Sequence, residues 1–243
     1  MKSVIFELIS NKKIAKNTYE WVLSGDISDI TAPGQFVNIQ LDGFYLRRPI
    51  SVCDACDGKL TLIFKAVGDG TEKMAKMLPG EKLDILSGLG NGYDLKKSGN
   101  SPLLIGGGAG VPPMYMLAKE LISEGKNPTV ILGFGSADEI FYKDEFEKIG
   151  ASVIVATADG SYGVKGFVTN AMEGVDYSYF YTCGPEPMLK AIYEKSETSG
   201  QFSFEERMGC GFGACMGCSC KTKYGNKRIC RDGPVLEKEE IIW

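Results

Sequence analysis

The residues in this chain that are best suited to chemistry are its cysteines, and five of the eight lie between positions 210 and 230. Four of these five have the spacing C-x4-C-x2-C followed by a more distant cysteine, which is typical of plant-type 2Fe-2S ligands. The four predicted ligands are Cys210, Cys215, Cys218 and Cys230. Electron transfer through an iron-sulfur cluster is therefore the first chemistry that the sequence indicates.

The glycines between these cysteines favour the same interpretation. Gly211, Gly213 and Gly217 let the backbone wrap closely around sulfide and donate N–H groups to the cluster sulfurs. A zinc knuckle and a disulfide lattice are the alternatives. Zinc favours two separated C-x2-C pairs, and disulfides do not suit a chain in which we expect no leader sequence. Cys220 is a surplus thiol, either a bystander or a competitor of Cys218 for the cluster.

The chain contains no histidine. This excludes Ser-His and Cys-His nucleophile pairs, His-ligated zinc, and an imidazole acid or base working near neutral pH. Electron and hydride transfer remain feasible, because in such reactions the cofactor supplies the chemistry and the protein binds and orients it.

The composition and net charge of the chain limit the kinds of partner that it can bind. The chain has 44% apolar and 24% charged residues, as ordinary globular proteins do, and a net charge of -4, which argues against nucleic acid and anionic membranes as partners. The apolar stretch near the N-terminus has about five residues, against roughly 20 for a membrane span. We expect a cytoplasmic protein.

A glycine-dense turn follows an apolar run in LLIGGGAGVPPM, with glycines at 106, 107, 108 and 110 and proline at the start of the following helix. A helix N-terminus after such a turn presents N–H groups to a pyrophosphate. The turn departs from G-x-G-x-x-G, because Val111 stands at the third glycine position, so a merely tight strand-to-helix connection is the alternative. Asp138 and Glu139 follow the next strand and favour NAD over NADP, unless they are ordinary first-turn acids.

Two further motifs lie in the N-terminal part. Arg47-Arg48-Pro49-Ile50-Ser51 places cations and a hydroxyl where a pyrophosphate could bind, or forms a solvated strand end. Cys53 and Cys56 form a C-x2-C pair, which could be a redox dithiol or half a metal site. Because no second pair accompanies it, a turn with two ordinary thiols is the simpler interpretation.

The elements that must position these residues divide the chain into three parts. Short alternating runs separated by glycine turns predict an antiparallel β-barrel over residues 1–99, with one helix at 71–77. Alternating strands and helices predict a parallel-sheet α/β domain over 100–204, with helices at 112–123, 143–149, 167–172 and 185–195. Residues 205–243 have little apolar periodicity and need a metal to stay folded. The expected class is a multidomain α+β protein.

Several of these motifs together resemble the ferredoxin-NADP reductase superfamily: RPIS at 48–51, KAVGDGT at 65–71, the GGGAGVPP turn, and YTCGP at 181–185. The resemblance implies that Arg48 and Ser51, with Pro49 and Ile50 between them, contact FAD phosphates, that residues Ile63, Phe64 and Lys65 flank the flavin, and that Gly70 and Thr71 hold its pyrophosphate. It also implies that Gly106, Gly107, Gly108 and Gly110 bind NAD and that Cys183, Gly184 and Pro185 lie near the nicotinamide. For Cys183, a small buried residue at a strand end is an equally good interpretation.

ERMGCGFGACMGCSCKTK at 206–223, RRPISV and the DGSYGVKGFVT run from Asp159 more closely resemble the electron-transfer subunits of type B, NAD-dependent dihydroorotate dehydrogenases. The resemblance covers essentially the whole chain. It implies a complex with an FMN-containing catalytic subunit, two copies of each, in which electrons pass from FMN through 2Fe-2S and FAD to NAD. Related subunits of hydrogenases, sulfite reductases or NADP-ferredoxin systems, and a stand-alone NADH reductase, are the alternatives.

Overall fold

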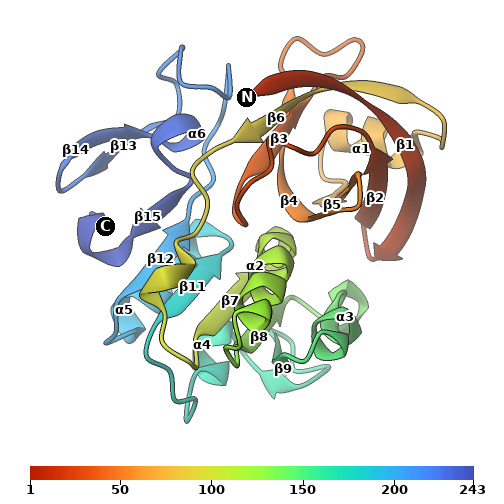
Figure 1. The fold of residues 1–243 in the computed structure, drawn as a ribbon. Helices are drawn as coiled ribbons and strands as arrows, with labels where there is room; N and C mark the ends of the chain where they lie inside the picture. Colours follow the sequence, from red (N-terminus) through yellow and green to blue (C-terminus); the bar gives the residue numbers. More distant parts are fainter.

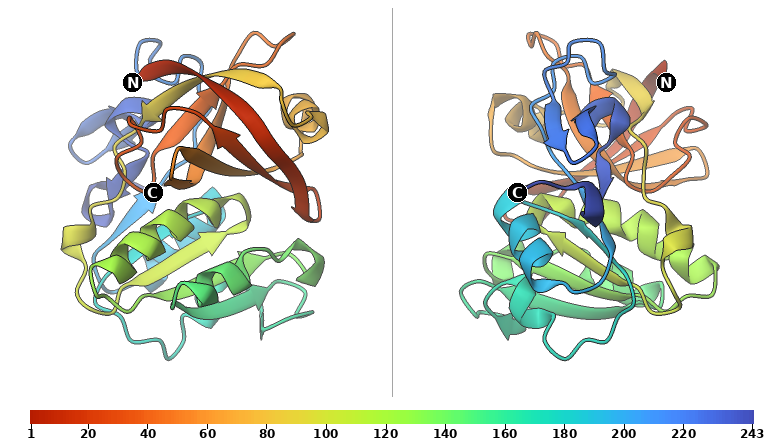
Figure 2. Two further views of the ribbon diagram at one scale, coloured as in Figure 1. Left: turned by 45° about the vertical axis from the view of Figure 1, so that its right-hand side comes forward. Right: turned by 90° about the vertical axis from the view of Figure 1, so that its left-hand side faces the viewer.

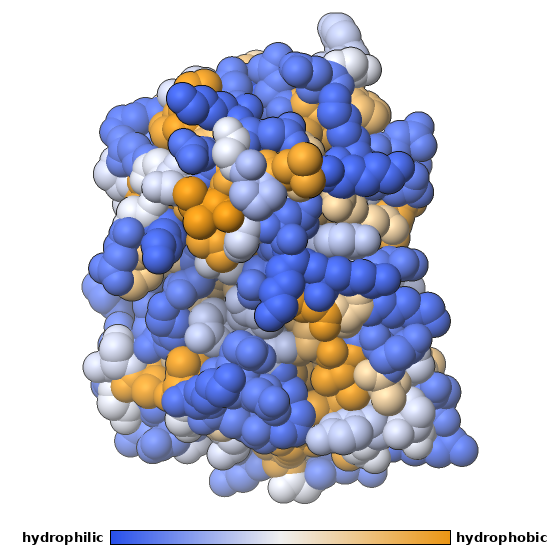
Figure 3. All heavy atoms as spheres, turned by 90° about the vertical axis from the view of Figure 1, so that its right-hand side faces the viewer, coloured by the Kyte–Doolittle hydropathy of each residue, from blue (hydrophilic) through white to orange (hydrophobic).

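The computed structural model describes residues 1–243, which form a closed barrel, a seven-stranded sheet flanked by helices, and a small cysteine-bearing segment (Figure 1). The three-part α+β architecture expected from the sequence is confirmed. None of the helices is long and apolar enough to cross a membrane. Figure 3 shows a mostly hydrophilic face on the side of β1 and α3, on which the apolar side chains form separate patches.

The barrel is antiparallel, and the residue alternation of its strands fills its interior. Leu60, Leu62 and Phe64 alternate along one strand and are all buried, with Trp21 edge-on to Phe64 at 5.3 Å between ring centroids. The strands, hydrogen-bonded in the order β1-β2-β5-β4-β3-β6, are β1 (Lys2–Ala15), β2 (Thr18–Ser24), β3 (Phe36–Ile39), β4 (Arg48–Cys56), β5 (Lys59–Lys65) and β6 (Lys82–Leu89). Helix α1 (Asp69–Lys76) connects β5 to β6 and begins two residues before the predicted start.

The second layer is a mostly parallel sheet in the order β10-β9-β8-β7-β11-β12-β15. Its first six strands are β7 (Leu103–Gly107), β8 (Thr129–Phe134), β9 (Ser152–Thr157), β10 (Val164–Lys165), β11 (Phe180–Cys183) and β12 (Gly200–Ser203). Its helices are α2 (Pro112–Ser123), α3 (Lys143–Lys148), α4 (Val168–Ala171) and α5 (Glu186–Lys195), and short 3-10 turns are η1 (Leu95–Lys97), η2 (Gly108–Gly110) and η3 (Ala137–Glu139). Each predicted helix is present within about two residues.

The apolar strands of this sheet are buried on both faces, as a parallel sheet requires. On β7, Leu104 packs toward α2, whereas Leu103 and Ile105 pack toward α4 and α5. Helix α2 also packs against β4, so it lies between the sheet and the barrel (Figure 1). The carboxyl ends of β7 and β11, where the glycine turn and the Cys183–Pro185 segment lie, are thereby brought next to the barrel.

The cysteine-bearing segment contains the hairpin β13 (Ser219–Thr222) and β14 (Gly225–Arg228), then α6 (Ile229–Asp232), β15 (Val235–Glu237) and η4 (Lys238–Glu240). Strand β15 pairs antiparallel with β12, so the segment completes the edge of the dinucleotide-domain sheet. Both views of Figure 2 show the blue segment beside the barrel. It is therefore attached to both other parts of the molecule.

Candidate cofactor sites

The four predicted cluster ligands lie on one loop and one short helix. Cys210, Cys215 and Cys218 precede β13, and Cys230 lies on α6. The Cys210 Sγ atom accepts hydrogen bonds from the backbone N–H groups of Ala214 (3.2 Å) and Cys215 (3.4 Å). The Cys218 Sγ atom accepts one from the N–H of Cys230 at 3.4 Å. Backbone donors aimed at sulfur are the contacts that stabilise bound thiolates.

The thiols form two pairs. The Cys210 side chain lies beside that of Cys215, and the Cys230 side chain lies beside that of Cys218, close enough for the second thiol of each pair to influence the pKa of the first. A 2Fe-2S cluster has two irons and four cysteine ligands, and these four cysteines fit that donor set.

Two of these thiols have opposite pKa shifts. Burial alone would raise the pKa of Cys210, but the backbone N–H groups of its own loop outweigh that effect and lower the pKa to about 6. Burial, together with the facing thiol of Cys218, raises the pKa of Cys230 to about 12. At neutral pH, Cys210 is therefore mostly the thiolate, which is the form that binds iron.

The loop that carries Cys210, Cys215 and Cys218, called the cluster loop below, lies directly on the barrel. Gly211 has φ +79°, and a Cβ atom there would lie 2.4 Å from Nδ2 of the buried Asn38 on β3. Asn38 Nδ2 also donates to the carbonyl oxygen of Cys210 at 3.5 Å. A side chain at position 211 would be strained and would push the loop away from β3. Cys220 lies outside this loop, half-buried on β13.

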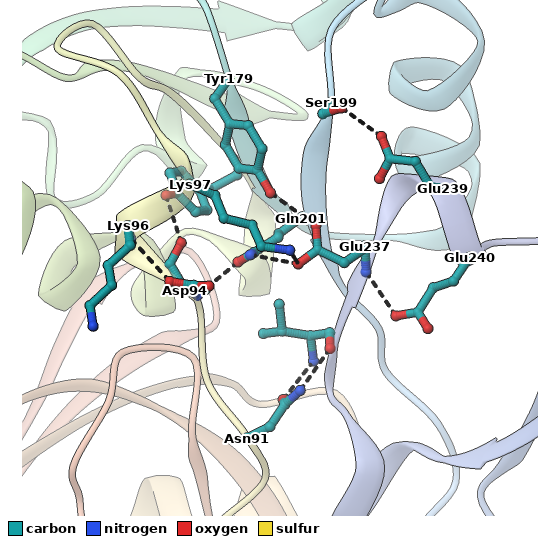
Figure 4. Close-up of polar contacts among 12 residues, drawn as sticks. Asn91, Asp94, Lys96, Lys97, Tyr179, Ser199, Gln201, Glu237, Glu239 and Glu240 are labelled. Carbon is teal, nitrogen blue, oxygen red and sulfur yellow. Dashed lines mark hydrogen bonds and ion pairs between the residues drawn. The ribbon is translucent and has the colours of Figure 1, made fainter. Parts of the chain in front are cut away.

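Polar contacts hold β15 to the segment that connects the barrel to the sheet (Figure 4). Asn91 Nδ2 donates to the carbonyl oxygen of Val235 at 2.8 Å, and its Oδ1 accepts from the N–H of the same residue at 3.1 Å. The Glu237 carboxylate accepts from Lys97 Nζ (2.8 Å), Gln201 Nε2 (2.9 Å) and the Tyr179 hydroxyl (3.0 Å). The helix that carries Cys230 therefore leads directly into an anchored strand.

The predicted flavin-phosphate residues converge at the start of α1. A Cβ atom on Gly70 would lie 2.1 Å from the Arg48 Nε atom, so the helix backbone and the guanidinium touch. The Arg48 guanidinium also lies 4.7 Å above the centre of the Phe44 ring. Thr71 Oγ1 accepts from the N–H of Gly68 at 3.2 Å. A cation beside the positive end of a helix suits a pyrophosphate.

The neighbouring predicted residues have different surroundings. Arg47 is an ion-pair residue of the barrel, with its guanidinium 3.1 Å from the Asp84 carboxylate. Pro49, Ile50 and Ser51 are half-buried on β4. On β5, Ile63 packs toward the dinucleotide domain and Phe64 into the barrel core, so the Phe64 side chain is turned away from the other cofactor residues.

A cavity of about 890 Å³ lies between the barrel, α5 and the cluster segment. Arg48 and Pro49 line one side, and Gly184 and Pro185 line another. The sequence analysis missed much of its wall, namely Glu186, Glu205, Glu206, Arg207, Met208 and Trp243, and Cys220 also lies there. The acidic and basic run immediately before the first cluster cysteine was the signal that could have pointed to it.

A second cavity, of about 520 Å³, lies over the glycine turn. The glycines permit close packing, since a Cβ on Gly110 would lie 2.1 Å from the carbonyl oxygen of Cys183, and one on Gly107 would lie 2.4 Å from Sδ of Met188. The turn is therefore pressed against the β11–α5 connection, and α2 begins directly behind it. Pro185 lines both cavities.

The remaining candidate residues differ in burial and in their surroundings. Burial raises the pKa of the Cys183 thiol to about 12, so it is neutral at physiological pH. Asp138 is exposed and pairs with Lys16 at 3.1 Å, whereas Glu139 lines the second cavity. Burial raises the pKa of Cys53, whose thiol contacts Tyr142, while Cys56 is exposed on the same strand.

Comparison with known proteins identifies two of the three parts. Residues 205–242 match the model described as the iron-sulfur cluster binding domain of dihydroorotate dehydrogenase B, and residues 104–194 match the oxidoreductase NAD-binding domain. The dihydroorotate dehydrogenase B (NAD(+)) electron transfer subunit of Bacillus mycoides is 42% identical over 97% of this chain and 96% of its own length. The chain belongs to the family of dihydroorotate dehydrogenase B electron transfer subunits. The Fusobacterium nucleatum member is 44% identical over 95% of each chain.

A solved structure outside these subunits has the same architecture as this family member. It is an NADH-dependent reduced ferredoxin-NADP oxidoreductase studied for flavin-based electron bifurcation. Its TM-score is 0.90 at 30% identity, covering 98% of this chain and 90% of the other. The ferredoxin-NADP reductase-like fold expected from the sequence is thereby confirmed.

Proposed function

We propose that this chain passes electrons from the FMN-containing catalytic subunit of a dihydroorotate dehydrogenase to NAD+, and so supports the oxidation of dihydroorotate to orotate in pyrimidine biosynthesis. The family supports the pathway. The observation that carries the mechanism is that Pro185 is shared by the two cavities, so a flavin in the larger and a nicotinamide in the smaller would meet there. Met208, Cys220 and Ile229 of the cysteine-bearing segment line the larger cavity, which supports electron entry into this cavity from the cluster.

When bound, the 2Fe-2S cluster carries single electrons and FAD collects two and donates a hydride to NAD+. The residues of the chain bind and orient these groups. In our proposal Arg48, Pro49, Ile50, Ser51, Gly70 and Thr71 hold FAD, and the ligands of the cluster are Cys210, Cys215, Cys218 and Cys230. Ile63 and Phe64 flank the flavin through backbone or side chain, and Lys65 flanks it through its backbone, because its side chain lies in the smaller cavity. Gly106, Gly107, Gly108 and Gly110 hold NAD, with Cys183, Gly184 and Pro185 at its nicotinamide.

We further propose an FAD domain at 1–99, an NAD domain at 100–204 and a cluster domain at 205–243, although β15 belongs to the sheet of the second domain.

The exposed Phe212 (41%) and Met216 (54%) on the cluster loop favour this loop as the partner-facing surface. Two copies of each subunit would form the complex. Eight unpaired cysteines support a cytoplasmic location.

The deciding experiment is anaerobic affinity purification of the chain from its native cells, with mass spectrometry of the co-purifying subunit and an assay of dihydroorotate-dependent NAD+ reduction. An FMN-containing partner with this activity supports the proposal. A ferredoxin-linked partner would favour the second candidate, a ferredoxin-NADP oxidoreductase subunit, which the 0.90 TM-score supports. A monomer with NADH reductase activity would contradict both.

The FAD assignment has its own test. Arg48→Ala should lower the FAD content of the purified chain, because it removes the cation at the start of α1. Arg47→Ala is the matched control, since that side chain pairs with Asp84 within the barrel. Equal FAD loss in both variants would show that barrel stability, and not a phosphate contact, retains the flavin.

A further inference from the structure

An ion pair crosses from the barrel into the cavity over the glycine turn. Lys65, the last residue of β5, places its Nζ atom 2.6 Å from Oε2 of Glu139 in η3. Each side chain is 25% exposed. Among the residues that line this cavity, these two are the only charged ones. The pair therefore sets the electrostatic character of the space.

The position of the pair relative to the glycine turn is informative. A Cβ atom on Gly108 would lie 3.9 Å from Lys65 Nζ, and one on Gly135 would lie 2.9 Å from Oε1 of Glu139. The cation is thus beside the turn that precedes α2, where a dinucleotide pyrophosphate would be placed by backbone N–H groups. The carboxylate that neutralises it comes from the opposite wall, at the end of β8.

We propose that Glu139 is a built-in competitor of the dinucleotide phosphates for Lys65. In the ligand-free cavity its carboxylate is the counter-charge of Lys65. When a nucleotide binds, its negative charge takes that place, and Glu139 is left as a like charge near the phosphates. The pair thereby weakens the binding of NAD+ and NADH and favours nucleotide release. This inference rests on the proposed function, because it requires that NAD bind in this cavity.

The sequence gives the opposite expectation for Glu139, namely that it accepts a hydrogen bond from the ribose of NAD and strengthens binding. The two roles predict opposite signs for the same substitution. Because the side chains are partly solvated, removing the charge of Glu139 should tighten nucleotide binding by roughly tenfold. Loss of a ribose contact would weaken it instead.

The test compares variants of the full chain loaded with FAD and its cluster, using calorimetric titration with NAD+. Glu139→Gln should lower the Kd for NAD+ roughly tenfold, Glu139→Ala should change it in the same direction, and Lys65→Met should raise it. Asp54→Asn is the matched control, because Asp54 pairs with Lys119 across the barrel–α2 contact, also at 2.6 Å, outside the cavity. Its Kd should equal that of the wild type.

The possible results distinguish failure of the proposed function from failure of the proposed role of Glu139. Wild-type chain that binds no NAD+ would overturn the proposed function itself. Wild-type binding with unchanged or weaker binding by Glu139→Gln would overturn the competitor role and leave the function standing. Equal tightening by Asp54→Asn would also overturn it, because loosened contact between the domains would then explain the effect.

Discussion

Replacing Glu237 by glutamine should loosen the strand that follows the cluster helix. The carboxylate of Glu237 meets three donors: Lys97 and Gln201 at Oε1 and the Tyr179 hydroxyl at Oε2 (Figure 4). In all three hydrogen bonds the carboxylate is the acceptor. In Glu237→Gln, the amide oxygen can accept from Lys97 and Gln201 while the NH2 group donates to the Tyr179 hydroxyl, which can accept, so the contacts persist but lose the negative charge.

The expected cost follows from these contacts. A hydrogen bond to a charged group contributes about 1.5–3 kcal/mol, against about 0.5–1.5 kcal/mol for a bond between neutral groups. The bond from Tyr179, which is only 5% exposed, should weaken most, whereas the 44% exposed Lys97 contributes little. We therefore expect Glu237→Gln to lower the free energy of unfolding by about 1 kcal/mol.

The assay is thermal unfolding of the loaded chain, together with hydrogen exchange at residues 91–98 and 235–237. At about 2–4 °C per kcal/mol for a chain of this size, Tm should fall by roughly 2–4 °C, and exchange should accelerate in both segments. Glu239→Gln is the control, since that carboxylate bonds only to Ser199 at an exposed position. If Glu237→Gln matched this control in Tm and exchange, the anchoring of β15 through Glu237 would be refuted.

Four more substitutions test the remaining assignments. Cys215→Ser should abolish iron binding and retain FAD, whereas Cys220→Ser should retain both; iron and flavin analysis checks this, and full iron content in Cys215→Ser would refute the ligand assignment. Gly110→Ala places a methyl group 2.1 Å from the carbonyl oxygen of Cys183, so stability should fall by about 1–3 kcal/mol and NAD+ affinity with it, as measured by denaturation and titration. The hydrogen bond from Arg47 lowers the pKa of Asp84, so this carboxylate stabilises the fold above its unfolded pKa of about 4 and loses that effect as pH falls through its lower folded pKa. Asp84→Asn should therefore be less stable at pH 7, by under about 1 kcal/mol, and should approach the wild type in acid unfolding curves near pH 2–3.

Features that depend on neighbouring residues could be predicted from the sequence alone. The cysteine spacing indicated a 2Fe-2S site because the backbone between the ligands must wrap one small cluster. Helix α2 begins and ends at the predicted Pro112 and Ser123, since proline, the glycine turn and the apolar periodicity are all local signals. The barrel and the parallel sheet followed from strand alternation and from the strand–helix rhythm in the same way.

Only the tertiary structure decided between residues of the same type. Arg47 and Arg48 are adjacent and chemically alike, but where β4 begins, Arg47 points toward Asp84 and Arg48 toward α1. Asp138 faces solvent, while Glu139, one residue later, reaches Lys65 across the domain boundary. Their roles could not be predicted because alternate strand and turn positions point in opposite directions, and the partner comes from a distant segment.

The larger cavity and strand β15 also depend on the tertiary fold. Residues 205–208 and Trp243 line a space whose other walls come from β4 and α5, and no local pattern indicates such a meeting. Strand β15 has three residues and becomes a strand by completing the edge of β12. The sequence by itself therefore determined the chemistry of each motif, whereas long-range packing determined which motifs meet, because pairing between distant segments depends on the whole folded chain.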